Sequence, residues 1–416
     1  MNVAVVLEHR FVRTPDGRVW TKTFFARSFW QRYLSVFDGV RVIARVRRVD
    51  HPPEDVLRVD SDQISVSEVP AYVGPLQYAM RIHAVRSALR RALHPEEALI
   101  LRVSSQLANI VEPIVRRAGH PYAVEVVADP ADVFRPGSVK HPLRPFFHWW
   151  FPKKLRAQCQ RAVAAAYVTE NMLQRSYPPG PNTFMTHYSS VELRDESFVE
   201  EPRKPFSVGR SIKLLMVGTL EQLYKAPDVL LDALAICLRR GEDLELTFVG
   251  EGRMTSALQK QANDLGIAAR VRFVGSVTSG AAVREWLDKS DLFVLPSRQE
   301  GLPRAMVEAM ARGLPCIGSA AGGIPELLRA DEVVPVANAE ALALKISEVV
   351  ADQDRMAAMS ERNLRRSRDF HESELCQRRM AMYRHLYEAT LAVQSKRRKA
   401  TATATGLASA RGKGGW

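Results

Sequence analysis

Short apolar runs alternate along the chain with longer segments of helical periodicity. In the first 200 residues the apolar runs predict strands at residues 3–7, 40–46, 98–103, 123–127 and 164–169. Helical patterns fill two of the intervals, at residues 75–93 and 105–118. Strands that alternate with helices in this way are typical of parallel sheets covered by helices.

A second alternation begins at Lys213. It predicts strands at 214–217, 245–249, 271–274, 292–295 and 316–318, separated by helices near 227–239, 253–265, 279–289 and 303–312. The junction is expected within residues 196–212, where prolines and a glycine interrupt both patterns. The fold class is therefore α/β, with a domain at 1–200 and a domain at 201–371.

The C-terminal part differs from both domains. A long helix is predicted over residues 372–395. Residues 396–416 are of low complexity and basic, so a disordered tail is expected there.

Composition is that of an ordinary globular protein, with 46% hydrophobic and 25% charged residues over 416 positions. The four cysteines form no C-x-x-C pair, which argues against a zinc site or a disulfide framework and fits a reducing compartment. No apolar stretch approaches the length of a membrane span, and the N-terminus has no signal-peptide pattern. The expected location is cytoplasmic, with peripheral attachment to the inner face of the membrane as an option.

The net charge is +13, of which six positive charges lie in residues 396–416. A basic balance favours nucleic acid, anionic lipid or a phosphorylated ligand as partner. Because no helix-turn-helix, zinc-finger or RRM pattern occurs, we expect no nucleic-acid partner.

The most informative segment is residues 297–326, in which Glu300 and Glu308 lie eight positions apart. Glu300 ends a polar loop after the apolar strand, and Glu308 lies in a helix predicted to start near Pro303, a residue suited to the first helical position. The start of a helix offers backbone N–H groups to a phosphate or another anion. A simpler interpretation is that Glu300 only complements the helix dipole and that Glu308 is solvated.

A run of small residues follows Glu308, then a strand at 314–318 and a glycine loop at 322–326. The whole block resembles the donor-binding signature of the retaining glycosyltransferases of family 4, the group 1 glycosyl transferases. The resemblance implies the GT-B fold, in which two Rossmann-like domains face each other across a cleft. The second domain would bind a nucleoside diphosphate-sugar donor, and the first would bind the acceptor.

The resemblance also implies roles for individual residues. Glu308 would accept hydrogen bonds from the donor ribose, and Glu300 would lie beside the transferred sugar. Lys225 would stabilise the leaving diphosphate as a point charge. The further donor-binding positions are Gly218, Thr219, Val274, Gly275, Val277, Gly301, Leu302, Pro303 and Arg304, and the nucleotide base would pack near Phe273–Val277. Because the helix dipole and Lys225 take over the task of a divalent cation, we expect no metal and no other cofactor.

This sequence departs from the family pattern at two places. Thr219 stands where an arginine is expected, and Arg253, Arg298 and Arg304 are the candidates to replace it. Near residue 128, where the family often has a histidine, Asp129 follows a predicted strand. Asp129 would either act in catalysis at the strand's carboxyl end or cap the next turn.

Residues 141–162 combine five aromatic residues with flanking arginines and lysines. Such a mixture suits an anionic membrane surface, together with the basic tail. The alternative is a helix that packs into the core of the first domain.

The function predicted by the resemblance is retaining, metal-independent transfer of a sugar from a nucleoside diphosphate to a glycan or a lipid-linked acceptor. A role in cell-surface or exopolysaccharide biosynthesis follows only by family analogy. Two alternatives stay open: a sugar-nucleotide epimerase on the same fold, and a catalytically silent scaffold that binds nucleotide or membrane. The base, the sugar, the acceptor and the oligomeric state are not specified by the sequence.

Overall fold

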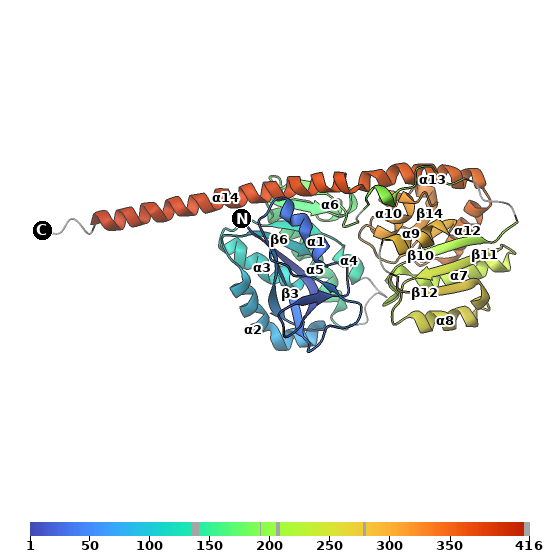
Figure 1. Ribbon diagram of the computed structural model, residues 1–416, viewed down its shortest axis with the longest axis horizontal. Helices are drawn as coiled ribbons and strands as arrows, with labels where there is room; N and C mark the ends of the chain where they lie inside the picture. Colours follow the sequence, from blue (N-terminus) through green and yellow to red (C-terminus); the bar gives the residue numbers. More distant parts are fainter. Residues whose placement is uncertain (135–140, 192, 205–208, 278–279, 412–416) are drawn as a thin grey trace.

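A computed structural model describes residues 1–134, 141–191, 193–204, 209–277 and 280–411, with side chains up to Lys399. Two α/β domains lie side by side, and a long C-terminal helix runs across both (Figure 1). The first sheet ends at His187 and the second begins at Ile212. The junction predicted within residues 196–212 falls in this connection, of which residues 205–208 lie outside the described part.

The first sheet is parallel in the order β5-β3-β1-β6-β7-β8-β9. In addition, β2 pairs antiparallel with the carboxyl end of β1, and β4 pairs antiparallel with β2. Its strands are β1 (Val3–Arg13), β2 (Val19–Thr21), β3 (Val40–Arg48), β4 (Leu57–Arg58), β5 (Ile64–Pro70), β6 (Ala98–Val103), β7 (Ala123–Val126), β8 (Ala164–Tyr167) and β9 (Phe184–His187). The α-helices of this domain are α1 (Arg27–Gln31), α2 (Gly74–Ala92), α3 (Gln106–Arg117), α4 (Pro130–Val133), α5 (Arg144–Arg161) and α6 (Met172–Ser176).

The second sheet is parallel throughout, in the order β12-β11-β10-β13-β14-β15. Its strands are β10 (Ile212–Val217), β11 (Leu244–Val249), β12 (Val271–Gly275), β13 (Leu292–Leu295), β14 (Cys316–Ser319) and β15 (Val333–Val334). The α-helices are α7 (Pro227–Arg239), α8 (Thr255–Asp264), α9 (Ala281–Asp288), α10 (Arg304–Ala311), α11 (Ile324–Leu327), α12 (Ala339–Val350) and α13 (Gln353–Ser367). The strand order reverses between β10 and β13, and ligands of such sheets bind at the carboxyl ends of the strands beside this point.

Every strand predicted from the sequence is present, but five were not predicted: β2, β4, β5, β9 and β15. Four of these are no longer than four residues, and β5 mixes buried with half-exposed positions at an edge of the sheet. Short or edge strands lack the continuous apolar run of a strand buried on both faces. Helix α10 begins at Arg304, with Pro303 as its N-cap residue, one position later than the prediction.

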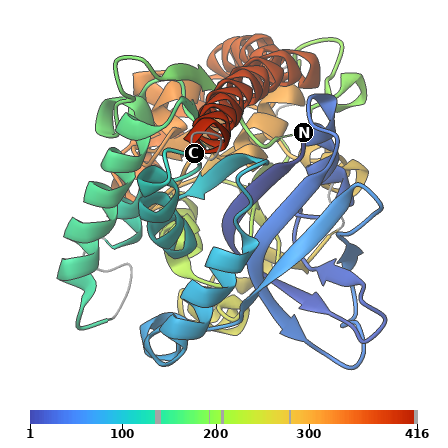
Figure 2. The same cartoon turned by 90° about the vertical axis from the view of Figure 1, so that its left-hand side faces the viewer.

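Helix α14 (Glu372–Arg411) leaves the second domain and packs along the first (Figures 1 and 2). Its Tyr383 ring stacks on Tyr33 at 4.9 Å, and Gln394 donates to the Glu96 carbonyl at 3.0 Å. The prediction that the helix ends at 395 and that a disordered tail follows is wrong for residues 396–411, which are helical. Alanine-rich sequence has a high helix propensity, and basic residues suit the carboxyl half of a helix. Residues 412–416 lie outside the described part.

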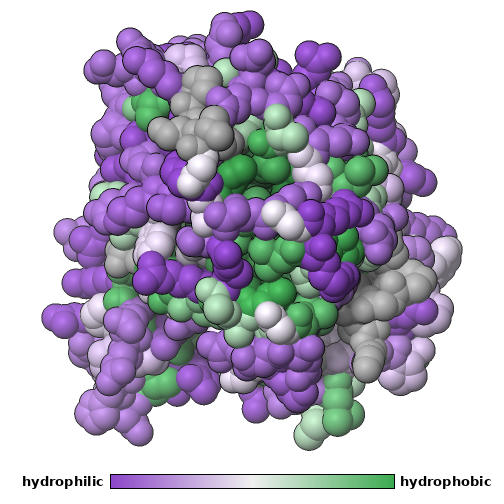
Figure 3. Space-filling view, turned by 90° about the vertical axis from the view of Figure 1, so that its right-hand side faces the viewer, coloured by the Kyte–Doolittle hydropathy of each residue, from purple (hydrophilic) through white to green (hydrophobic). Residues whose placement is uncertain are grey.

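The end of the second domain that faces away from the first is seen in Figure 3, where hydrophobic residues gather near the middle of a largely hydrophilic face. A cavity of about 370 Å³ is lined by Lys213, Asp291 and Pro315, which precede or begin β10, β13 and β14. This cavity therefore lies at the amino ends of the strands, at the edge opposite to Glu300. No helix within the described residues is long and apolar enough to cross a membrane.

Candidate active site

An ion pair between Lys225 and Glu300 lies at the carboxyl edge of the second sheet. Lys225 ends a short 3-10 helix (Leu223–Lys225) after β10, and Glu300 follows β13, which pairs with β10. Lys225 Nζ lies 2.7 Å from Glu300 Oε1, and the two side chains are only 14% and 10% exposed. The Ser297 hydroxyl donates to the same oxygen at 2.8 Å. The structure thus brings together a carboxylate and an ammonium that are 75 positions apart in the sequence.

Gly218 makes room for this lysine. A Cβ atom at Gly218 would lie 2.5 Å from Lys225 Cδ, so a larger residue would displace the stem of the lysine. The next residue, Thr219, is exposed, and its hydroxyl accepts from the Glu221 N–H at 3.3 Å. Position 219 therefore contributes no cation, as the sequence indicates.

The three arginines that could replace a cation at position 219 have different surroundings. Arg298 forms two 2.7 Å contacts with the Asp228 carboxylate and donates to the Leu223 carbonyl at 2.7 Å, so it holds the loop that carries Lys225. Arg253 is exposed and pairs with Glu221 at 2.8 Å. Arg304 lies at the start of α10, and its guanidinium is 4.1 Å from the centre of the Phe24 ring in the first domain. Arg304 therefore reaches across to the first domain.

Glu308 lies on α10, one turn after Arg304, between the buried residues Val307 and Ala309. Burial raises the pKa of its carboxyl group, while Arg304 and Arg284 act to lower it. A half-buried carboxylate is stabilised by hydrogen-bond donors. The binding of a ribose by Glu308 stays a prediction.

The loop that carries Glu300 touches the first domain at Gly301. A Cβ atom at Gly301 would lie 2.3 Å from the Val127 carbonyl oxygen, directly after β7, and 3.4 Å from Val168 Cγ2, after β8. The carboxyl ends of the two sheets therefore meet at the predicted site. Val127 and Val168 also line a cavity of about 10 Å³, which has room for about one water molecule.

The predicted base-binding segment lies at the same edge of the sheet. Val274 and Gly275 end β12, and the Gly275 carbonyl accepts from the Gly250 N–H at 2.8 Å. Val277 packs half-buried against the core. The binding of a base by these three residues stays a prediction, as does the binding of a donor by Gly301, Leu302, Pro303 and Arg304.

Asp129 caps a helix within the first domain. It follows β7, accepts from the Ala131 N–H at 2.8 Å at the start of α4, and accepts from the Tyr177 hydroxyl. These contacts match the capping alternative. A catalytic role of Asp129 stays a prediction.

Helix α5 divides into a buried and an exposed half. Leu155, Gln158 and Cys159 are buried in the core of the first domain, whereas Phe146 and Trp149 are 49% and 56% exposed. The helix stands at the outer side of the domain, at the lower left of Figure 2. Core packing therefore explains only its second half.

Two contacts of the site were missed by reasoning from the sequence. Ser297, in the loop before Glu300, bonds Glu300, and Phe24 stacks with Arg304 from the other domain. The position of Ser297 directly after a buried strand and its proline was a usable signal. No sequence pattern indicated Phe24, because its partner Arg304 is 280 positions away. Among the described residues no group of three or more histidine, cysteine, aspartate or glutamate side chains could hold a metal ion.

Comparison with known proteins agrees with this geometry. The sequence model of the family described as Glycosyl transferases group 1 matches residues 198–366, which include Lys225, Glu300 and Glu308. Residues 198–366 belong to the group 1 glycosyl transferases. Protein CapJ of Staphylococcus aureus is 28% identical to this chain over 300 residues, which cover 72% of the chain and 74% of CapJ.

A second relative and a solved structure extend the comparison. The amylovoran biosynthesis glycosyltransferase AmsK of Erwinia amylovora is 33% identical over 153 residues, covering 34% of this chain and 37% of AmsK. The structure of Anabaena HepE in complex with UDP-glucose is similar with a TM-score of 0.61 at 16% identity, covering 94% of this chain and all of HepE. The architecture of two parallel sheets meeting at their carboxyl ends is the GT-B fold, as the sequence predicted.

Proposed function

We propose that this glycosyltransferase moves a sugar from a nucleoside diphosphate donor to a hydroxyl of a glycan or lipid-linked acceptor, with retention of configuration and without a metal ion. The observation that carries the proposal is the ion pair of Lys225 and Glu300, shielded from solvent where the two domains meet. The similarity to the amylovoran biosynthesis glycosyltransferase AmsK supports a role in the assembly of a polysaccharide.

The charges at the site suit the reaction. Transfer passes through a transition state in which the sugar gains positive and the leaving diphosphate gains negative charge. The Glu300 carboxylate would stabilise the sugar, and Lys225 with the N-terminus of α10 would stabilise the diphosphate. Before the donor binds, the charges of the two side chains compensate each other at a distance of 2.7 Å.

Binding of a nucleoside diphosphate should raise the melting temperature. A ligand present at one hundred times its Kd adds about 2.7 kcal/mol to the free energy of unfolding. We expect a clear shift with one of UDP, GDP and ADP or their sugar conjugates, and the same shift with EDTA present. A shift that disappears with EDTA would contradict metal independence, and no shift with any nucleotide would contradict the donor site.

The acceptor would approach from the first domain at the surface of an anionic membrane. The exposed half of α5 presents Phe146 and Trp149, and Lys153 lies 4.8 Å from the centre of the Trp149 ring. Aromatic rings at the headgroup level and cations beside them are the usual composition of an interfacial segment. The basic residues near the end of α14 would add to the attraction.

We expect the protein to float with vesicles that contain an anionic phospholipid and to stay unbound with neutral vesicles. The double substitution of Phe146 and Trp149 by serine should reduce the floating fraction several-fold, because the apolar anchor is lost. The matched control is Leu344→Ser, since Leu344 is 52% exposed on α12 of the other domain. Equal binding to neutral and anionic vesicles would contradict the membrane proposal.

A further inference from the structure

One short segment of the second domain contacts both the Glu300 loop and the first domain. The Gly323 N–H donates to the Gly301 carbonyl at 2.6 Å, and a Cβ atom at Gly322 would lie 2.1 Å from the Glu300 carbonyl oxygen. Three positions further along, Glu326 in α11 reaches the first domain. The position of the Glu300 loop is thus coupled to the contacts of Glu326.

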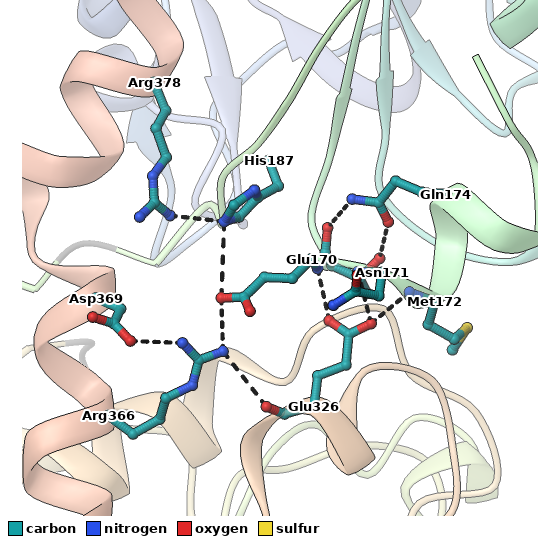
Figure 4. A network of polar contacts seen from close by, with 10 residues as sticks. Glu170, Asn171, Met172, Gln174, His187, Glu326, Arg366, Asp369 and Arg378 are labelled. Carbon is teal, nitrogen blue, oxygen red and sulfur yellow. Dashed lines mark hydrogen bonds and ion pairs between the residues drawn. The ribbon is translucent and has the colours of Figure 1, made fainter.

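The Glu326 carboxylate caps a helix of the other domain. It accepts three backbone N–H groups at the start of α6, from Glu170 at 2.7 Å, Asn171 at 3.0 Å and Met172 at 2.5 Å (Figure 4). Asn171 is the N-cap residue of α6, but its own side chain makes no capping bond. The cap that most helices draw from their own N-cap residue is therefore supplied here across the domain boundary.

An ion pair lies beside this cap. Arg366 of α13 contacts the Glu170 carboxylate at 2.7 Å and also donates to Asp369 at 2.6 Å. His187, at the end of β9, lies 3.8 Å from Glu170 and 3.0 Å from Arg378 of α14 (Figure 4). Burial and the nearby Arg378 lower the pKa of His187, so its ring is neutral at pH 7 and can accept from Arg378.

These contacts hold the two domains together beside Glu300. Since Gly301 lies directly against the Val127 carbonyl, we expect the domains to part as a nucleotide-sugar enters and to close again around the bound donor. Opening at this boundary separates Glu326 from α6 and Arg366 from Glu170. Hydrogen bonds to a charged group are stronger than neutral ones, so these contacts favour the closed arrangement. Closure of this kind completes the catalytic arrangement in many enzymes, and the later opening often limits turnover.

We propose that Glu326 is a positioning residue, an interdomain latch whose carboxylate closes the two domains and sets the Glu300 loop against the first domain. The assignment to catalysis rests on the proposed function, whereas the effect on closure does not. A closed arrangement in solution depends on the negative charge of Glu326 and not on its shape alone.

Solution scattering and kinetics of Glu326→Gln and Glu326→Ala test the latch. We expect wild-type scattering to match the closed arrangement, and the radius of gyration to increase from wild type to Glu326→Gln to Glu326→Ala. The donor KM should rise about tenfold or more in Glu326→Gln. A merely structural defect would instead lower kcat through a smaller active fraction at unchanged KM. The control is Glu340→Gln, since the Glu340 side chain is 78% exposed in the same domain.

Each outcome decides the proposal. The latch proposal would be overturned if the scattering of the wild type matched an open molecule. It would also be overturned if both variants had the radius of gyration of the wild type. Loss of activity in a Glu326 variant whose scattering still matches the closed arrangement would overturn it too, because Glu326 would then affect activity without affecting closure. If the wild type shows no transferase activity, the proposed function fails while the scattering still tests the latch. If Glu326→Ala does not fold, Glu326→Gln carries the comparison.

Discussion

Substitution of Glu300 by glutamine should lower the rate of sugar transfer by about 10²–10³-fold, the range found when one preorganised charge-stabilising group is removed. Glutamine keeps the shape of the side chain and can still bond Ser297, but it removes the negative charge beside the transferred sugar. The substitution leaves the shielded Lys225 ammonium without its counter-ion, so the melting temperature must be measured beside the activity. The measurement is the initial rate of nucleoside diphosphate release at saturating donor and acceptor.

The control for this substitution is Glu285→Gln, since the Glu285 side chain is 71% exposed on α9 of the same domain. It should retain wild-type activity. Full activity of Glu300→Gln would contradict the catalytic role of the carboxylate. Absence of turnover in wild type and variant alike, with nucleotide bound, would favour the catalytically silent scaffold.

Substitution of Lys225 by methionine should weaken the binding of the nucleoside diphosphate about tenfold and lower kcat further. Methionine preserves an unbranched apolar stem above Gly218 but lacks the ammonium group that would neutralise the leaving diphosphate. Because charge on the leaving group increases in the transition state, the loss in kcat/KM should exceed the loss in nucleotide affinity. Calorimetry gives the affinity, and initial rates over a range of donor concentrations give kcat and KM.

Removal of Lys225 also leaves the shielded Glu300 carboxylate without its counter-ion, so the melting temperature must be measured beside the activity. Lys260→Met is the matched control, since the Lys260 side chain is 75% exposed on α8. Unchanged nucleotide affinity and unchanged kcat in Lys225→Met would place the diphosphate elsewhere.

The second domain was the more predictable half of the fold. Strand β13 was located to the residue, because all four of its positions are buried and form a continuous apolar run. The start and end of α7 were also predicted, as Pro227 suits the first helical position and a glycine follows at 241. In the first domain, the paired strands β2 and β4 are too short to give a periodic signal.

In the candidate site, the contacts between residues far apart in the sequence could not be predicted. The residues Glu300, Glu308 and Lys225 were predicted as site residues because they lie within recognisable local patterns. The pairing of Lys225 with Glu300 and the capping of α6 by Glu326 join residues 75 and about 155 positions apart, and single-sequence periodicity carries no information about such pairs. Arg298 was a candidate for the diphosphate by its charge alone, and the contact with Asp228 assigns it to the loop of Lys225.

The most direct test of the central claim is a crystal structure of the protein with the nucleoside diphosphate that gives the largest thermal shift. The account predicts that the diphosphate lies within hydrogen-bond distance of Lys225 Nζ, that the N-terminus of α10 faces it, and that the ribose hydroxyls donate to the Glu308 carboxylate. A nucleotide bound at the opposite edge of the sheet, beside Lys213 and Asp291, or a ribose with no contact to Glu308, would contradict it.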